Sequence, residues 1–139
     1  MRTTGRMMFS ATRRLERAYT GTDYLVGRMT LRIGRPLPDR LLGKANCAII
    51  ITAANPESRR APRAMNARRD ARLQVILRSE AAGIMPTLAR DPARRWPDEP
   101  GWLAKGLSLM HAAAIARRFR QNAIVVLRRR QPPCLHALR

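Results

Sequence analysis

Residues 47–58, CAIIITAANPES, carry the strongest local signals in the chain. The first seven residues are almost continuously apolar, and a short run of this kind predicts a strand buried on both faces near the centre of a sheet. The run stops at Asn55-Pro56, because proline lacks a backbone N–H group and biases the residue before it away from helix. The sequence therefore predicts a central strand over 47–53 that leads into a polar loop.

Two helices are predicted after this strand. Apolar residues recur at spacings of three and four within 63–82, which indicates a helix with Leu73 and Leu77 on its inner face. Ser108 is of a type that caps helix N-termini, and the residues after it carry an inner stripe composed mainly of alanine. The small alanine side chains allow the second helix to lie close to a sheet.

Further strands are predicted on both sides of the helices. The segment 29–33 alternates apolar and polar residues, which is the period of a half-buried strand. A loop with three prolines, RDPARRWPDEPG, separates two of the later strands and excludes regular structure between them. The other predicted strands are 84–89, 102–107, 123–127 and a possible edge strand at 134–138.

From residue 47 the predicted order is strand, helix, strand, strand, helix, strand. This βαββαβ order predicts a single α+β domain with the split βαβ arrangement of ferredoxin-like folds, in which an antiparallel or mixed sheet carries both helices on one face. A doubly wound parallel sheet is the alternative, but it requires a crossover helix that the proline-rich loop does not supply. Residues 1–17 are expected to form a basic helical segment, and 18–139 the domain itself, including the extra strand.

The composition favours a reduced, cytoplasmic protein. A chain of 139 residues is long enough to bury its own core. The only cysteines, Cys47 and Cys134, have no Cys or His neighbour at zinc-ligand spacing, so neither a metal nor another cofactor is expected. No apolar run approaches the roughly 20 residues of a membrane-spanning helix, and no membrane association is expected.

The net charge of +19 predicts nonspecific attraction to polyanions. All basic residues except Lys44 and Lys105 are arginine, and they are scattered along the chain in twos and threes. The chain has only two residues each of Trp, Tyr and Phe, and none lies in an RNP-like motif. Specific recognition of nucleic acid by the arginines is therefore an alternative function and not the first interpretation.

Polar residues stand at the points where the predicted strands and helices meet. In a split βαβ, the end of the first strand, the starts of the third and last strands and the start of the first helix share one edge of the sheet. We expect polar side chains from these four points to gather there as a rim that binds a ligand or a partner protein, with a tryptophan able to cover them. The predicted set is Asn55, Ser58, Asn66, Asp70, Trp96, Glu99, Gln121 and Asn122.

The chemistry of this rim favours binding over catalysis. Amides donate and accept hydrogen bonds but do not titrate, so they suit a ligand or a buried network better than acid–base chemistry. Structural roles are also open, since Asn55 is a typical turn residue and Asn66 and Asp70 can satisfy a helix N-terminus. The sequence contains no nucleophile elbow, P-loop or HExxH motif. An enzyme that uses Asp70 or Glu99 is a further alternative.

Several of these segments resemble one bacterial family. The segments ITAANPES, WPDEP and RRFRQNAIVVL, together with Asn66 and the upstream AYTGTDY and LRIG, are similar to the family named domain of unknown function 3293. The resemblance spans roughly residues 18–138. The family has no established activity, so the resemblance implies residues of interest and no function. These are Tyr19, Thr22, Tyr24, Asn55, Pro56, Ser58, Asn66, Glu99, Gln121 and Asn122.

The chain departs from the family pattern at two positions. Arg120 stands where the family has glycine, at an expected helix C-terminus, and a positive φ there costs a non-glycine residue on the order of 1 kcal/mol. Gly101 stands where serine commonly follows Glu-Pro, which removes a hydroxyl group from the expected rim.

Overall fold

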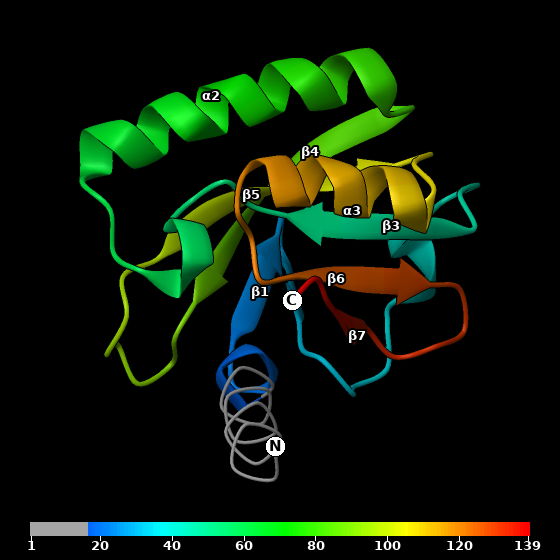
Figure 1. The fold of residues 1–139 in the computed structure, drawn as a ribbon. Coiled ribbons are helices and arrows are strands. Elements are labelled where there is room, and N and C mark those ends of the chain that lie inside the picture. The colour runs from blue at the N-terminus through cyan, green and yellow to red at the C-terminus, as the bar shows by residue number, and fades with distance from the viewer. Residues whose placement is uncertain (1–16) are drawn as a thin grey trace, which may run out of the picture.

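The apolar run forms β3 (Cys47–Ile51), and this strand lies inside a seven-stranded sheet in the computed structural model, which describes residues 17–139 (Figure 1). The strand order is β2-β1-β4-β5-β3-β6-β7, and every neighbouring pair is antiparallel. The fold class is therefore α+β. The other strands are β1 (Asp23–Val26), β2 (Met29–Leu31), β4 (Gly83–Arg90), β5 (Glu99–Lys105), β6 (Ala123–Arg128) and β7 (Cys134–Ala137).

Both long helices, α2 (Arg63–Glu80) and α3 (Leu109–Arg118), lie on the same side of the sheet (Figure 1). The Ser108 hydroxyl caps α3 by accepting a hydrogen bond of 3.1 Å from the backbone N–H of His111. The apolar stripes of the helices meet alternate residues of the central strands, including Ile49 and Ile51. This contact forms the larger of two cores.

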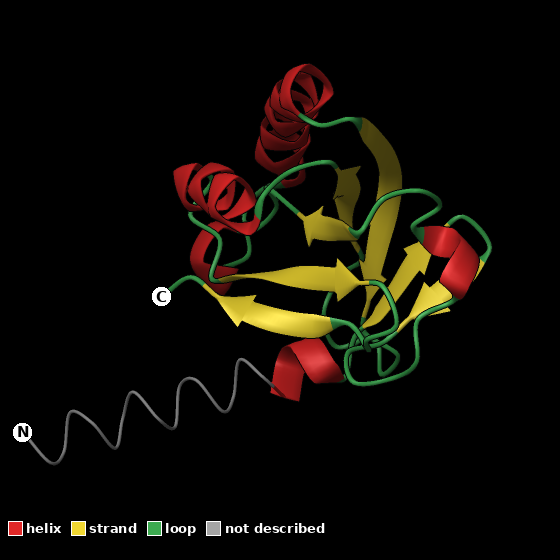
Figure 2. Cartoon of the chain, turned by 90° about the vertical axis from the view of Figure 1, so that its right-hand side faces the viewer, coloured by secondary structure: helices red, strands yellow, loops and turns green. Residues whose placement is uncertain are grey.

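The opposite face of the sheet carries the second core. Residues that alternate with those of the first core, such as Ile50 and Val125, point to this face and pack with Tyr24 and Val26 of β1. The sheet curls, so β1 and β2 turn away from the plane of β3 and β6 (Figure 2). A short 3-10 helix, η1 (Asp39–Leu41), contributes Leu41 to the second core.

Two features of the fold differ from the predictions, and a third prediction lies mostly outside the described residues. Strand β1 was not predicted, although Tyr24 and Val26 are buried and alternate with less buried neighbours. Strand β5 occupies 99–105 and not 102–107, because Pro100 fits into the sheet opposite Leu88. The predicted N-terminal helix falls mostly outside the described residues, which begin with a helical turn at 17–20.

Candidate functional site

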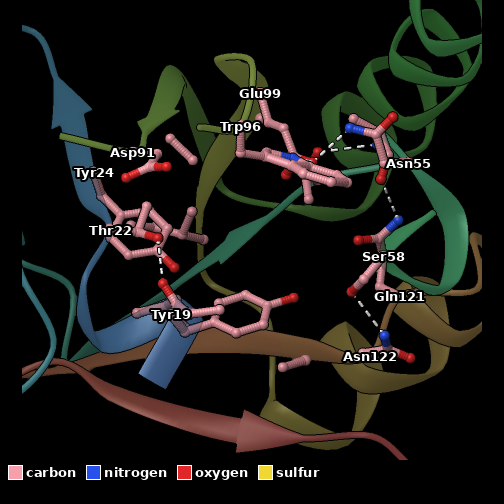
Figure 3. Close-up of a pocket in the computed structure, with 18 of the residues that line it drawn as sticks. Tyr19, Thr22, Tyr24, Asn55, Ser58, Asp91, Trp96, Glu99, Gln121 and Asn122 are labelled. Carbon is pink, nitrogen blue, oxygen red and sulfur yellow. Dashed lines mark hydrogen bonds between the residues drawn. The ribbon is translucent and has the colours of Figure 1, made fainter. Parts of the chain in front are cut away.

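A cavity of about 640 Å³ opens on the face of the sheet that the helices leave free (Figure 3). Its floor includes Ile50, Thr87, Gly101 and Val125, which come from four different strands. Its walls are the helical turn at the N-terminal end of the described chain, the loop between β4 and β5, and the segment around η2 (Pro56–Ser58). The cavity therefore joins segments that are far apart in the sequence.

Most of the residues predicted from the sequence line this cavity. Two of the predicted rim residues, Asn66 and Asp70, and the family residue Pro56 are not part of the lining. The predicted residues that do line it are Asn55, Ser58, Trp96, Glu99, Gln121 and Asn122, together with the family residues Tyr19, Thr22 and Tyr24.

Asn55 is the centre of a hydrogen-bond network behind one wall. It is 5% exposed and adopts the left-handed conformation, with φ 47° and ψ 66°. Its side-chain oxygen accepts hydrogen bonds of 2.9 Å from the backbone N–H of Ala61 and from Nδ2 of Asn66. The backbone N–H of Asn55 donates in return to Oδ1 of Asn66, at 2.9 Å. Asn66 thus supports the cavity from outside by fixing Asn55.

The next two amides connect the start of β6 to the loop after β3. Gln121 is 4% exposed, and its Nε2 donates to the carbonyl oxygens of Ala54 and Phe119, at 3.0 and 3.2 Å. Nδ2 of Asn122 donates to the Ser58 hydroxyl at 2.8 Å (Figure 3). Asn55 and Asn122 therefore lie at the same edge of the sheet, as the strand order requires.

Glu99 presents a carboxylate to the cavity without a cationic partner. Its Oε1 accepts hydrogen bonds from Nδ2 of Asn55, at 2.6 Å, and from Nε1 of Trp96, at 2.8 Å. Both donors are neutral, and none of the ion pairs within residues 17–139 involves Glu99. No described residue donates a hydrogen bond to Oε2. The negative charge is therefore positioned but not neutralised.

Two tyrosines form the wall opposite Asn55 (Figure 3). Burial, followed by the charge of Glu99, raises the pKa of Tyr19 to about 12, while the Ser58 side chain opposes this shift. Tyr24 is 5% exposed, and its hydroxyl is buried without a hydrogen-bond partner among the described residues. Burial, followed by the Tyr19 and Glu99 side chains, raises the pKa of Tyr24 further. Both phenols are protonated at neutral pH.

Thr22 has a structural role in the same wall. Its hydroxyl donates a hydrogen bond of 2.7 Å to the carbonyl oxygen of Ala18, which closes the helical turn before β1 (Figure 3). The turn is also closed by the backbone N–H of Gly21, which donates to the carbonyl oxygen of Arg17 at 3.0 Å. This local order positions Tyr19 and Tyr24 on either side of the turn.

Asp70 lies apart from the cavity. Its Oδ1 accepts a hydrogen bond of 3.0 Å from Nε1 of Trp102, a residue that packs against the core under the helices. Burial raises the pKa of Asp70, while the hydrogen bond from Trp102 opposes this shift. Asn66 and Asp70 follow one face of α2, but the first meets the loop after β3 and the second meets the sheet.

Other lining residues were not predicted from the sequence. Asp91 begins the loop after β4, and its carboxylate accepts hydrogen bonds of 2.9 Å from the backbone N–H groups of Ala93 and Arg95. The hydrogen bond from Ala93 is the main cause that lowers the pKa of Asp91. The Asp-Pro sequence at 91–92 is typical of turns, so the turn at Asp91 could have been predicted from the sequence. Nothing local in the sequence marks Thr52, Thr87 or Arg17 as lining residues.

The segment after β3 stores backbone strain beside the cavity. Asn55, Glu57 and Ser58 all have positive φ, at 47°, 58° and 59°, although none of them is glycine. Non-glycine residues in this region cost roughly 1 kcal/mol or more each, and such strain clusters at functional sites. Hydrogen bonds hold the segment in place, among them one of 2.7 Å from the Glu57 backbone N–H to the Arg120 carbonyl oxygen.

The described residues contain no grouping of three or more His, Cys, Asp or Glu side chains suited to a metal ion. Within residues 17–139, no helix combines the length and the apolar character needed to cross a bilayer. Cys47 and Cys134 are both free thiols.

The fold and the site together define an α+β protein with a ligand-sized cavity, since small-molecule pockets have volumes of roughly 300–1,000 Å³. The chain matches the family described as "Protein of unknown function (DUF3293)" over residues 51–124, which is more than half of its length. It therefore belongs to this family, as the motifs predicted. No curated protein and no solved structure matches the chain.

Proposed function

We propose that the chain is a small cytoplasmic domain that binds a ligand in this cavity without chemical transformation. The observation that carries the proposal is Tyr24, which lines the cavity and whose buried hydroxyl has no hydrogen-bond partner among the described residues. Leaving a buried hydroxyl unpaired costs roughly 1–3 kcal/mol. A ligand that bonds to this hydroxyl recovers part of that cost. The two free cysteines are consistent with a reducing compartment.

The hydrogen-bond network supports binding over catalysis. The side chains that contact the Glu99 carboxylate, Asn55 and Trp96, are not nucleophiles. Asp70, the other carboxylate that an enzyme could use, does not reach the cavity. The buried amides bind each other and the backbone, so they build the cavity wall and leave the tyrosines and Glu99 to meet a ligand.

The test compares the wild-type protein with the Tyr24→Phe variant. Native mass spectrometry of the wild-type protein, purified without denaturation, is expected to show a retained small molecule. The variant removes the unpaired hydroxyl, so we expect the ligand-free variant to gain about 1 kcal/mol in free energy of unfolding while it loses the retained molecule. Absence of any retained or stabilising molecule for the wild-type protein would overturn the proposal.

A second candidate function is polyanion binding through the arginines. It is supported by the net charge and by α2, along which Arg63, Arg68, Arg72 and Arg78 are all exposed. Coulomb attraction alone gives such a surface affinity for phosphate backbones at low salt. We therefore expect this binding to be nonspecific, and its salt dependence is the measurement that decides.

We also infer that residues 47–128 follow the ferredoxin-like split βαβ connectivity. The inference is supported by the order β4-β5-β3-β6 in the middle of the sheet and by the position of α2 and α3 on one face (Figure 1). In this interpretation β1, β2 and β7 are additions at the two edges. Ile49 is opposite Ala104 on β5 and opposite Val126 on β6. Cross-strand NMR contacts from Ile49 to each of these residues test the two central pairings.

A further inference from the structure

The state of Glu99 is unusual in a chain with 28 basic and nine acidic residues. Three other acidic side chains of the described region pair with arginines: Asp23 with Arg32, Glu57 with Arg139 and Asp98 with Arg90. Glu99 has no such partner, although Arg17 and Arg95 line the same cavity. The Glu99 carboxylate accepts hydrogen bonds from neutral donors, and no arginine forms an ion pair with it within the described residues.

Aromatic rings are concentrated around this carboxylate. Tyr19, Tyr24 and Trp96 line the cavity, and they are half of the chain's aromatic residues, which comprise two each of Trp, Tyr and Phe. Aromatic faces attract cations through the negative face of the ring, most strongly for tryptophan. The Trp96 ring already binds one cation in this way, since the guanidinium carbon of Arg60 lies 5.4 Å from its centroid. Arg60 is not among the residues that line the cavity.

The electrostatics of the cavity disfavour an anion. The charge of Glu99 reaches both phenols, where it contributes to the raised pKa of Tyr19 and of Tyr24. The same field repels a negatively charged group placed between the tyrosines. The net charge of +19 repels cations at long range, but salt screens it beyond about 8 Å at physiological ionic strength. Arg17, Asp91 and Arg95 also line the cavity, but beside Trp96 and the two phenols the Glu99 carboxylate favours a cation.

We propose that the cavity binds a small organic amine, whose ammonium group contacts the Glu99 carboxylate beside Trp96 while another polar group of the ligand pairs with the Tyr24 hydroxyl. This inference rests on the proposed function, because it names the chemical class of the ligand in the same cavity. A carboxylate with an unoccupied oxygen, three aromatic rings and an unpaired buried hydroxyl together match a protonated amine that carries a polar end.

The chain supplies an internal control for the experiment. Its two tryptophans lie on opposite faces of the sheet, and each indole N–H donates to a carboxylate: Trp96 to Glu99 and Trp102 to Asp70. Titrations with benzylamine, benzyl alcohol and benzoate, followed by the two indole N–H signals in NMR spectra, compare a cation, a neutral molecule and an anion of similar shape. We expect benzylamine to shift the Trp96 signal and to leave the Trp102 signal in place.

The matched variants are Glu99→Gln and Asp70→Asn. Each removes one negative charge and keeps an oxygen that can accept from the indole, but only Glu99 lines the cavity. Glu99→Gln is expected to weaken benzylamine binding at least tenfold, and Asp70→Asn to leave it unchanged. An equal loss in both variants would overturn the role of Glu99.

The probes separate this inference from the proposed function. Binding of benzyl alcohol or benzoate as tightly as benzylamine, with a shift of Trp96, would overturn the amine assignment and leave ligand binding intact. A Trp96 signal that benzylamine does not move up to its solubility limit would also overturn the assignment. The proposed function fails separately, through the absence of any retained or stabilising molecule.

Discussion

Arg120 adopts the left-handed conformation, with φ of 55°, at the point where α3 gives way to β6. The resemblance led us to expect glycine at this position, and the positive φ agrees with that expectation, since a β-carbon is disfavoured there. We expect Arg120→Gly to raise the free energy of unfolding by about 1 kcal/mol, measured by urea denaturation. The hydrogen bond from Glu57 to the Arg120 backbone does not depend on the side chain.

Arg118→Gly is the control for this prediction. Arg118 is the last residue of α3 and is exposed, so its replacement removes the same charge from a helical position. We expect this variant to lose about 1 kcal/mol, because glycine is a poor helix former. A gain in both variants would assign the effect to reduced charge repulsion and not to the backbone.

At position 101 the chain has glycine where the resemblance leads us to expect serine, the reverse of the case at Arg120. A β-carbon at this position would lie 2.9 Å from the carbonyl oxygen of Ile51 and 3.0 Å from the Thr87 hydroxyl oxygen. In this chain Gly101→Ser is therefore expected to lower the free energy of unfolding by about 1–3 kcal/mol through overpacking.

Gly83→Ser provides the comparison, since Gly83 is also in a strand and no atom lies within 4 Å of its expected β-carbon. Equal stabilities of the two variants in urea denaturation would show that the floor of the cavity adapts to a side chain at 101.

At the scale of elements, the loop from β3 through η2 depends on one side chain. Asn55→Ala removes an acceptor for Ala61 and Asn66 and a donor to Glu99, and it places alanine at positive φ. We expect a loss on the order of 3 kcal/mol in free energy of unfolding, from the unpaired groups and from the backbone conformation.

The control for this element is Asn122→Ala. Its side chain donates to the exposed Ser58 hydroxyl, and we expect its removal to cost less than about 1 kcal/mol. Similar losses for the two variants would contradict the view that the Asn55 side chain contributes more than that of Asn122 to holding the loop.

The elements that the sequence predicted well are those with long local patterns. The spacing of Leu73 and Leu77 located α2, and the serine and alanine pattern located α3. Strand β1 was not predicted because an alternation of four residues is too short to recognise. Its position beside β4 depends on pairing with residues that are distant in the sequence. Strand β5 was predicted at 102–107, with its start three residues late, because the proline-rich segment before it was expected to exclude regular structure, yet Pro100 is accommodated in the strand.

The candidate site was likewise predictable only where local patterns and strand order determine it. The amides at the shared edge could be predicted, because strand order alone brings Asn55, Gln121 and Asn122 together. The cavity itself could not be predicted, since it exists only where the sheet curls and Tyr24 of the unpredicted β1 faces the central strands. Asp70 was predicted to lie at the rim because it shares a helix face with Asn66. Helical spacing shows which residues share a face, but not which part of the protein each turn of α2 contacts, and Asp70 contacts Trp102 of the sheet.

The chain as a whole contains two tyrosines, and both lie in the cavity wall, so their ionisation reports on the entire fold. The pKa of Tyr19 is raised from its ordinary value of 10.0 to about 12, and that of Tyr24 is raised further. The folded state therefore keeps protons that the unfolded chain loses. This contribution to the free energy of unfolding is complete below pH 10 and is lost as the pH rises towards 12.

Near-ultraviolet absorbance of tyrosinate measures this effect directly. We expect no ionisation of the native protein at the pH where the urea-unfolded chain is half ionised. In the Tyr24→Phe variant the remaining phenol is Tyr19, and its midpoint is expected at about 12. Ionisation of the native wild-type protein near pH 10 would show that the cavity wall is open to water.

The net charge of +19 raises the question of whether the arginines have a shared function. A phosphate backbone is attracted to basic residues wherever they lie, and each released counterion adds to the salt dependence of the affinity. Nonspecific binding therefore depends on how many arginines are present, whereas a dedicated surface depends on which ones. Two triple variants with the same change of charge separate these cases.

One triple variant replaces Arg63, Arg68 and Arg78 of α2 with glutamine, and the other replaces Arg28, Arg35 and Arg40 near β2 and η1; all six side chains are exposed. For single-stranded RNA we expect both variants to lose affinity equally at low salt, and the wild-type protein to lose most of its binding at physiological salt. A selective loss in the α2 variant, with wild-type affinity retained at physiological salt, would instead make α2 a nucleic-acid surface. In that case the cavity and the arginines would serve separate functions on opposite faces of the sheet.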